Sequence, residues 1–333
     1  MTAKPQDATS ARFDQLTLTP ATLQNLEQLG FAQMTPIQAA SLPVTLAGQD
    51  LIAQASTGSG KTVAFGLPLI ERLQSAGSPS APVQAVILCP TRELADQVTM
   101  EIRRLARARQ NVKVVTLCGG VALRGQTVSL EHGADIVVGT PGRILDHLER
   151  GSLSLAGVNT LVLDEADRML DMGFFDDIAK VVRQCAKDRQ TLLFSATYPE
   201  GIDKLAAQFM RQPQTIKVEA QHSEHKIRQI FFEVNESERL HAVSSILAHY
   251  RPERTLVFCN TKQQCRDVVA VLQAQGLSAL ALYGELEQRE RDQVLVQFAN
   301  RSCSVLVATD VASRGLDVQG LEAVINVDVT PDP

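Results

Sequence analysis

Residues 51–62 have the sequence LIAQASTGSGKT, which joins an apolar run to a loop of small residues and a lysine–threonine pair. The run at 51–53 is typical of a short strand, and the apolar stretch at 63–73 is typical of a helix. A strand, a glycine-rich turn and a helix in this order are typical of a parallel α/β sheet. The stretch therefore predicts the fold class, and it places a loop at the edge of the sheet where such folds bind ligands.

The same alternation of short apolar runs and longer helical stretches continues along the 333 residues. Continuous apolar character suits strands that are buried on both faces, as in a parallel sheet. We expect such strands at 85–89, 112–117, 135–138, 160–163 and 191–194 and, after a break, at 255–259, 277–282, 304–308 and 323–327. The predicted fold class is therefore α/β, with two tandem parallel-sheet lobes.

The break between the two sets of strands is a polar stretch near 212–228. We place lobe 1 at residues 1–214, a linker region at 215–228 and lobe 2 at residues 229–333. Part of the linker region, 215–218, would also suit a short strand. Lobe 2 offers fewer strands than lobe 1, so we expect lobe 2 to be truncated at its C-terminus.

The composition excludes several classes of protein. Hydrophobic residues make up 44% and charged residues 21%, which excludes a disordered or collagen-like chain. No apolar run approaches the ~18 residues of a membrane span, and the polar first ten residues lack a signal-peptide core. We therefore expect a soluble, cytoplasmic protein with no membrane partner. The six cysteines form no C-x-x-C pair, which predicts buried, reduced thiols.

Charge and aromatic content restrict how a nucleic acid could be bound. The net charge of -5 gives no general basic field, and there is no Trp and only 4% aromatic residues. Neither a diffuse positive surface nor base stacking can therefore be the main source of affinity. A nucleic acid would need a local patch of placed hydrogen-bond donors.

The loop of the opening stretch has the features of a phosphate site. Gly58 and Gly60 allow backbone N–H groups to turn toward one point, and the start of the following helix adds partial positive charge. Lys61 would reach the β and γ phosphates of a nucleotide, and the Thr62 hydroxyl would bind Mg²⁺. Ala55 stands where the general pattern has glycine. The alternative is a plain connecting loop rich in glycine and serine.

Acidic residues directly follow the predicted strand at 160–163, at the edge where α/β sheets place ligands. Asp164 would hold Mg²⁺, through water, and Glu165 would orient and deprotonate an attacking water. The alternative is a solvated acidic helix start, because Asp and Glu also favour that position. The lysine loop favours the first interpretation.

The lysine loop, the acidic segment and Ser195-Ala196-Thr197 together resemble the DEAD-box ATP-dependent RNA helicases, over essentially the whole chain. Further segments follow the order of that family's motifs, at 30–38, 90–95, 119–120, 140–143, 257–261, 288–291 and 308–317. The resemblance implies two RecA-like lobes that bind ATP, Mg²⁺ and RNA.

The resemblance also implies a role for individual residues. The catalytic residues would be Lys61, Asp164, Glu165 and Arg314. ATP would be held by Phe31, Thr35, Gln38, Ser56, Thr57, Gly58, Ser59, Gly60, Lys61, Thr62 and Asp317, and the metal by Thr62 and Asp164. RNA would be bound by Pro90, Thr91, Arg92, Gly119, Gly120, Thr140, Arg143, Thr261, Gln288, Arg291 and Thr309. Coupling between ATP and RNA would fall to Ser195 and Thr197, through hydrogen bonds to the acidic segment.

Several of these residues have a simpler reading. The Gln38 amide can pair with the Hoogsteen edge of adenine, but a glutamine after Pro36 could also just begin a helix. Phe31 could belong to the core, and Thr197 could be an N-cap. Each residue assigned to RNA binding could instead have a structural role in a turn or as a helix cap. The six histidines, His132, His147, His222, His225, His241 and His249, lie in no motif and show no metal spacing, so we expect them at the surface or in the linker.

The implied activity is local unwinding of short RNA duplexes by a monomer that closes on RNA backbone and hydrolyses ATP. Stretches such as 88–98 and 164–174 resemble bacterial members that act in assembly of the large ribosomal subunit, so its RNA is a possible partner. The family's arginine-finger motif would follow Pro333, which predicts weak ATPase activity for the chain as given. The alternative is a non-catalytic ATP-gated RNA clamp, and a DNA helicase is a third option. Tyr283, Glu285 and Ser313 depart from the family's usual residues.

Overall fold

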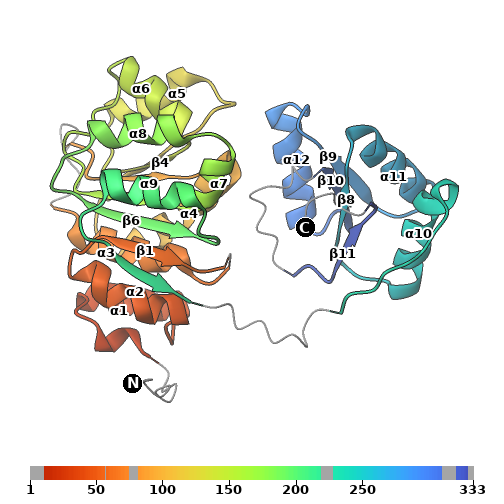
Figure 1. Cartoon of the computed structure of the whole chain (residues 1–333), viewed down its shortest axis with the longest axis horizontal. Helices are drawn as coiled ribbons and strands as arrows, with labels where there is room; N and C mark the ends of the chain where they lie inside the picture. Colours follow the sequence, from red (N-terminus) through yellow and green to blue (C-terminus); the bar gives the residue numbers. More distant parts are fainter. Residues whose placement is uncertain (1–10, 57, 75–81, 219–227, 310–319, 329–333) are drawn as a thin grey trace. The chain divides into compact units, whose positions relative to one another are not determined.

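The computed structural model describes residues 11–56, 58–74, 82–218, 228–309 and 320–328, and the chain divides into two compact units, 1–221 and 222–333. In the described part of the first unit, seven strands form one parallel sheet in the order β3-β4-β2-β5-β6-β1-β7 (Figure 1). The strands are β1 (Leu51–Gln54), β2 (Ala85–Leu88), β3 (Val114–Leu117), β4 (Ile136–Gly139), β5 (Thr160–Leu163), β6 (Gln190–Ser195) and β7 (Gln214–Lys217). The predicted parallel α/β fold is confirmed.

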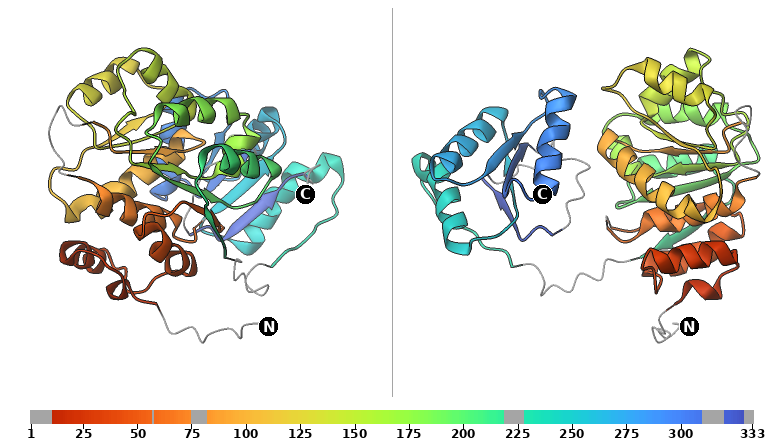
Figure 2. Two further views of the ribbon diagram at one scale, coloured as in Figure 1. Left: turned by 60° about the vertical axis from the view of Figure 1, so that its left-hand side comes forward. Right: turned by 180° about the vertical axis from the view of Figure 1, so that it is seen from behind.

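Helices cover both faces of this sheet, as expected for parallel strands joined by crossovers. In chain order they are α1 (Pro20–Gln28), α2 (Pro36–Leu46), α3 (Lys61–Arg72), α4 (Arg92–Leu105), α5 (Leu123–Glu131), α6 (Pro141–Glu149), α7 (Ala166–Asp171), α8 (Phe175–Gln184) and α9 (Glu200–Phe209), with short 3₁₀ turns at Phe13–Gln15 and Ala106–Ala108. Residues of α1 to α4 share one core with the sheet, and residues of α6 to α9 share the other. Helices α6, α8 and α9 lie in front of the sheet in Figure 1, and the view from behind in Figure 2 shows α3 and α4 on its other face.

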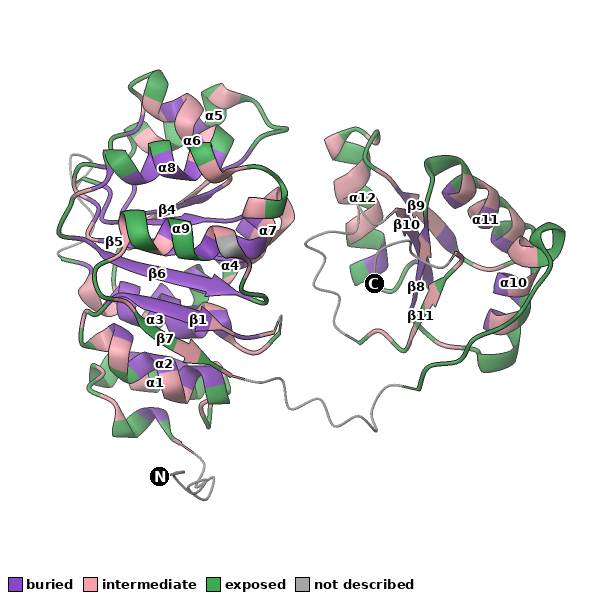
Figure 3. Cartoon of the chain, viewed as in Figure 1, coloured by how far each residue is buried: buried purple, intermediate pink, exposed green. Residues whose placement is uncertain are grey.

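The strands are buried because their side chains alternate between these two cores. In β1, Leu51 and Ala53 belong to one core and Ile52 to the other. The central strands are accordingly buried along their length, whereas the edge strand β7 is mostly exposed (Figure 3). Burial of each large apolar side chain stabilises the folded state by ~1.5–3 kcal/mol. Strands that face a core on both sides therefore consist of continuous apolar runs, and such runs can be recognised in the sequence.

The second unit repeats the architecture with fewer strands. Its described residues form a four-stranded parallel sheet in the order β11-β8-β10-β9. The strands are β8 (Thr255–Cys259), β9 (Ala279–Leu282), β10 (Val305–Thr309) and β11 (Ala323–Asn326), and the helices are α10 (Arg239–Tyr250), α11 (Lys262–Ala274) and α12 (Gln288–Ala299), with a 3₁₀ turn at Glu236–Glu238. Helices α10 and α11 pack in one core, and Phe298 of α12 packs in a second one on the other face.

The observed boundaries differ from the expected ones at the end of the first unit. Strand β7 pairs in parallel with β1, so the residues expected at the start of the linker region belong to the first sheet. The alternative of a short strand at 215–218 describes this segment better than a linker does. The rest of the expected linker lies largely outside the described residues.

Two expectations from composition can be compared with the structure. All six cysteines are free and buried. Among the described residues, no helix has both the length and the apolar character that a membrane span requires.

Candidate functional site

Except for residues 30–38, which lie between α1 and the first turn of α2, every segment singled out in the first unit lies at the carboxyl end of a strand. Because all seven described strands are parallel, these ends meet at one edge of the sheet. The phosphate loop follows β1, Ser195 ends β6, and the acidic segment follows β5, and these three strands are neighbours. The residues assigned to RNA follow β2, β4 and β3, which are also neighbours. We call the part of the edge at β1, β6 and β5 the nucleotide half, and the part at β2, β4 and β3 the RNA half, after the ligands predicted for their residues; the two parts meet between β5 and β2.

Gly60 in the phosphate loop has a backbone and a neighbour that only glycine permits. Its φ is +92°, in the left-handed region, and a Cβ at this position would lie 2.5 Å from Gln38 Nε2. Gln38 is buried and donates from Nε2 to the Gly60 carbonyl at 3.1 Å, while its Oε1 accepts from the Thr35 N–H at 2.9 Å. The glutamine predicted to read adenine therefore contacts the phosphate loop directly.

Lys61 begins α3 and is only 7% exposed, which is unusual for an ammonium group. Its Nζ donates to the Ala55 carbonyl at 3.3 Å, within the same loop. The hydroxyl oxygens of Thr35 and Ser59 are also buried, and neither has a hydrogen-bond partner among the described residues. Buried polar groups are normally hydrogen-bonded, so these hydroxyls are suited to accept or donate to a ligand.

The other residues predicted to bind the nucleotide lie in the phosphate loop, in the first turn of α3 and at the margin of the first core. Ser56 and Gly58 lie in the described part of the loop, Thr62 lies in the first turn of α3, and Thr57 lies outside the described residues. Phe31 packs at the margin of the first core, edge-to-face with Phe13 at 6.4 Å between ring centroids. This contact is compatible with a core role for Phe31, which was the alternative.

Asp164 is a buried carboxylate beside the lysine loop. Burial raises the pKa of Asp164 to about 6, an effect that Lys61 opposes and Glu165 reinforces. Its Oδ1 accepts from the Glu165 N–H at 3.0 Å. Glu165 has a φ of +50°, which is rare outside glycine, and its carboxylate forms an ion pair with Arg168 at 3.2 Å.

These donors fit a magnesium ion held jointly by protein and phosphate. Mg²⁺ favours oxygen ligands and is usually bound by one or two carboxylates plus substrate phosphates. Asp164 supplies a buried carboxylate whose charge Lys61 only partly offsets, and Thr62 supplies a hydroxyl at the start of α3. Among the described residues, no three His, Cys, Asp or Glu side chains converge into a self-sufficient metal cage. The protein ligands of Mg²⁺ would therefore be Asp164 and Thr62.

The predicted contact between the acidic segment and residues 195–197 is present. Asp167 Oδ2 accepts from the Thr197 N–H and the Thr197 hydroxyl, both at 2.8 Å, and from the Ala196 N–H at 3.2 Å. The Asp167 N–H donates to Ser195 Oγ at 3.2 Å. Burial alone would raise the pKa of Asp167, but the hydrogen bonds from Thr197 and Ser195 outweigh it and lower the pKa. The two segments are thus fastened by an ionised carboxylate.

The charge on Asp164 should cost the metal-free protein stability, and this can be measured. Because the folded-state pKa is about 6 and the ordinary value is 3.8, the unfolded chain loses its proton first as pH rises. Stability should therefore fall between pH 4 and 6 and stay low above that. In EDTA at pH 7.5, we expect Asp164→Asn to raise the free energy of unfolding by roughly 1–3 kcal/mol in urea titrations. At pH 4 the gain should vanish, and a gain independent of pH would contradict this account.

In the RNA half of the edge, some predicted residues also have structural partners. Thr91 is the N-cap of α4, and its Oγ1 accepts from the Leu94 N–H. Arg92 forms an ion pair with Asp96 one turn later, at 3.6 Å. Pro90 is buried and Thr140 is partly exposed, whereas Gly119 and Gly120 are exposed in the loop after β3. In this half of the edge, the backbone is therefore most accessible at Gly119 and Gly120.

In the second unit, the corresponding residues again follow neighbouring strands. Thr261 follows β8 and caps α11 through a bond from the Gln264 N–H, and Thr309 ends β10. Gln288 and Arg291 lie in the first turn of α12, after β9, and Gln288 donates to Asp292 at 2.9 Å. Arg314 and Asp317 lie outside the described residues.

One expectation about histidines is wrong. His147 is completely buried, and its ring nitrogens contact Gln126 and Ser152. Its partner Gln126 also binds Arg143, one of the residues assigned to RNA. The signal in the sequence was its spacing: His147 follows Ile144 by three residues and so shares the buried face of α6. His222 and His225 lie outside the described residues.

Comparisons with known proteins agree with this geometry. Residues 35–205 match the DEAD/DEAH box helicase family, and residues 238–333 match the helicase conserved C-terminal domain. The chain is 51% identical over 316 residues to the ATP-dependent RNA helicase DbpA of Escherichia coli, covering 95% of this chain and 68% of that protein. It is 41% identical to the DEAD-box ATP-dependent RNA helicase CshA of Streptococcus pneumoniae, covering 97% of this chain and 61% of that protein.

Solved structures of the same kind are also similar. A DEAD box protein from Methanococcus jannaschii is 41% identical, with a TM-score of 0.59 and coverage of 97% of this chain and 86% of that chain. Dbp5 of Saccharomyces cerevisiae, solved with RNA and ADP BeF3, is 28% identical with a TM-score of 0.84, covering 96% of this chain and 81% of that chain. With the family matched over more than half of its length, the chain belongs to the DEAD/DEAH box helicases, as a member of the DEAD-box ATP-dependent RNA helicases, which are ATPases.

Proposed function

We propose that this chain binds ATP with Mg²⁺ on the nucleotide half of the first sheet edge and uses its hydrolysis to bind and locally unwind RNA. One observation carries the proposal: the lysine loop, the acidic segment and residues 195–197 follow three neighbouring strands, and the last two are hydrogen-bonded to each other. The similarity to relatives named as ATP-dependent RNA helicases and to Dbp5 bound to RNA and ADP BeF3 supports it.

Each residue of the nucleotide half has a distinct task in this proposal. Lys61 binds phosphate oxygens in place of the Ala55 carbonyl, because a charge-assisted bond to phosphate is stronger than one to a neutral carbonyl. Gln38 pairs with adenine and transmits that contact to the loop through the Gly60 carbonyl. Mg²⁺, held by Asp164 and Thr62, offsets phosphate charge. Glu165 orients a water molecule and takes its proton.

Coupling to RNA begins at the Asp167 carboxylate. Asp167 is three residues after Asp164, and its carboxylate accepts hydrogen bonds from the N–H groups of Ala196 and Thr197. A shift in the acidic segment after β5 would therefore also move the residues that follow β6. The RNA half presents exposed glycines and the donors of Arg92, Thr140 and Arg143, which suit phosphate and 2′-OH groups more than base edges. We propose that RNA is bound by its backbone, with little sequence preference.

A non-catalytic clamp is the second candidate function. The relatives DbpA and CshA are both named as helicases, so the comparisons do not favour that alternative. A role in assembly of the large ribosomal subunit, with ribosomal RNA as partner, stays a prediction that rests on the resemblance seen in the sequence.

The proposal is tested by RNA binding with and without nucleotide. We expect a non-hydrolysable ATP analogue with Mg²⁺ to raise the affinity for a fluorescent ten-nucleotide single-stranded RNA by about 10-fold or more, within the usual range of coupling between sites. Anisotropy titrations measure this affinity. The DNA strand of the same sequence should bind more weakly because it lacks the 2′-OH, and the GTP analogue should have little effect because Gln38 mispairs with guanine. RNA affinity that does not change with the ATP analogue would contradict the proposal.

A further inference from the structure

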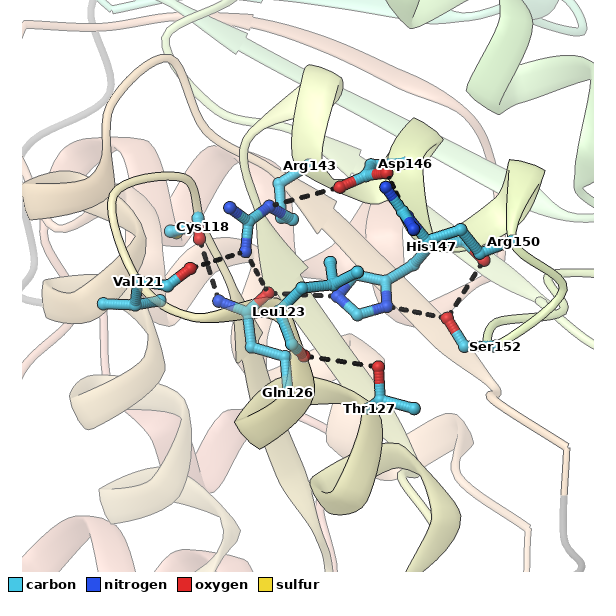
Figure 4. Close-up of polar contacts among 10 residues, drawn as sticks. All are labelled: Cys118, Val121, Leu123, Gln126, Thr127, Arg143, Asp146, His147, Arg150 and Ser152. Atoms are coloured by element: carbon cyan, nitrogen blue, oxygen red, sulfur yellow. Dashed lines mark hydrogen bonds and ion pairs between the residues drawn. The ribbon is translucent and has the colours of Figure 1, made fainter.

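A buried polar network joins helices α5 and α6 beneath the RNA half of the sheet edge (Figure 4). His147 on α6 lies at its centre, with Nε2 3.0 Å from Gln126 Oε1 and Nδ1 2.8 Å from Ser152 Oγ. The same Gln126 oxygen accepts from Arg143 Nη1 at 3.0 Å. Gln126 Nε2 donates to the Cys118 carbonyl at 2.8 Å, and Arg143 Nη1 also donates to the Val121 carbonyl at 3.1 Å.

The bonds in this network fix the state of the histidine. Gln126 must point its NH₂ group at the Cys118 carbonyl, so its oxygen faces two donors, Arg143 and His147. His147 therefore carries its proton on Nε2, and Nδ1 lies 2.8 Å from the Ser152 hydroxyl, which also donates to the His147 carbonyl at 3.2 Å. A neutral ring agrees with the surroundings, because burial, followed by the nearby Arg143, lowers the pKa of His147. The imidazole is a fixed single donor to Gln126.

The network ends at groups assigned to RNA. Cys118 and Val121 flank Gly119 and Gly120, so the bonds to their two carbonyls hold the exposed glycine loop from both sides. Arg143 is oriented by the two acceptors of Nη1 and by an ion pair from Nε to Asp146 at 3.9 Å, and 15% of its side chain is exposed. One buried glutamine thus contacts both the glycine loop, at the Cys118 carbonyl, and the arginine.

We infer that His147 is a positioning residue for RNA binding: by donating to Gln126 Oε1 it holds that amide in the orientation that places Arg143 and the 119–120 loop against RNA phosphate. This inference rests on the proposed function, since it assumes that this half of the edge binds RNA. His147 itself touches no RNA in this account. A histidine with a purely structural role would affect stability without selectively changing the electrostatic part of RNA binding.

Two matched substitutions separate these roles. His147→Gln can place an amide N–H where Nε2 lies, whereas the shorter His147→Asn places its amide near Nδ1 and leaves Gln126 Oε1 without its second donor. Both variants bury an amide in the same site, so their stabilities should be similar. His132→Gln is the control outside the network, because His132 is exposed at the end of α5 and contacts the Val128 carbonyl.

The measurement is single-stranded RNA affinity of the full chain with the non-hydrolysable ATP analogue, at several salt concentrations. We expect His147→Asn to weaken RNA binding about 5- to 10-fold and to lower the salt slope by about 0.7, the value for one lost phosphate contact on a single strand. His147→Gln and His132→Gln should stay within twofold of the parent. Arg143→Gln should weaken RNA binding about as much as His147→Asn does. The double variant should lose no further RNA affinity, because both substitutions remove the same contact.

The results of these binding measurements distinguish an error in the positioning role of His147 from an error in the proposed function. If the Asn and Gln variants bind RNA equally, or if the losses from Arg143→Gln and His147→Asn add, the positioning role is wrong while the proposed function stands. If the unaltered chain shows no ATP-dependent RNA binding, the proposed function fails and the inference with it. Should His147→Asn fail to fold, a normal salt slope for Gln126→Leu would equally overturn the inference, because that change removes the shared acceptor of Arg143.

Discussion

Replacing Lys61 by alanine should lower the affinity for the ATP analogue about 100-fold, which corresponds to ~2.7 kcal/mol. The ammonium group is almost fully buried at the start of α3, so its attraction to phosphate oxygens is weakly screened by water. It contacts the neutral Ala55 carbonyl and offsets part of the rise that burial causes in the pKa of Asp164.

Calorimetric titration with the analogue and Mg²⁺ measures this loss, and thermal unfolding shows that each variant is folded. Lys180→Ala is a suitable control, because Lys180 is exposed on α8 and lies outside both halves of the sheet edge. Equal nucleotide affinities for the Lys61→Ala variant and the parent would contradict the nucleotide site itself. The proposed roles of Gln38 and Glu165 would then have no basis.

The fold and the position of the site can be predicted because they depend on local pattern. A strand buried on both faces needs a continuous apolar run, and β2 has one along its whole length and β5 has one after Thr160. The phosphate loop is recognisable because φ values such as that of Gly60 exclude most other residues. Since parallel strands end at the same edge, finding the strands is enough to bring the site residues together.

The features that cannot be predicted depend on partners far away in the sequence. The bond from Gln38 to the Gly60 carbonyl joins residues 22 apart, and that between His147 and Gln126 joins residues 21 apart. Nothing in the sequence around Gln38, Gln126 or His147 reveals which polar group each side chain will contact. Strand β7 resembles a linker in sequence because it lies at the sheet edge, where one neighbour and high exposure permit polar residues such as Gln214 and Lys217.

Glu165→Gln should slow ATP hydrolysis by about 10²- to 10⁴-fold, the usual contribution of a general base. Glutamine keeps the shape of the side chain and can still orient a water molecule, but it cannot take the proton. The left-handed backbone at this residue and the ion pair with Arg168 fix the carboxylate at the edge, next to Asp164. Affinity for ATP should be unchanged or slightly higher, because one negative charge near the phosphates is removed.

Single-turnover phosphate release with saturating RNA measures the chemical step, and the comparison is between variant and parent whatever the parent's absolute rate. Glu149→Gln, an exposed residue at the end of α6, controls for loss of a carboxylate elsewhere in the first unit. Arg168→Gln should reduce the rate less than Glu165→Gln, since it frees the carboxylate to move without removing it. If Glu165→Gln releases phosphate at the parent rate while RNA and ATP still bind cooperatively, the base must be another group. The acidic segment would then serve metal binding and coupling alone, through Asp164 and Asp167.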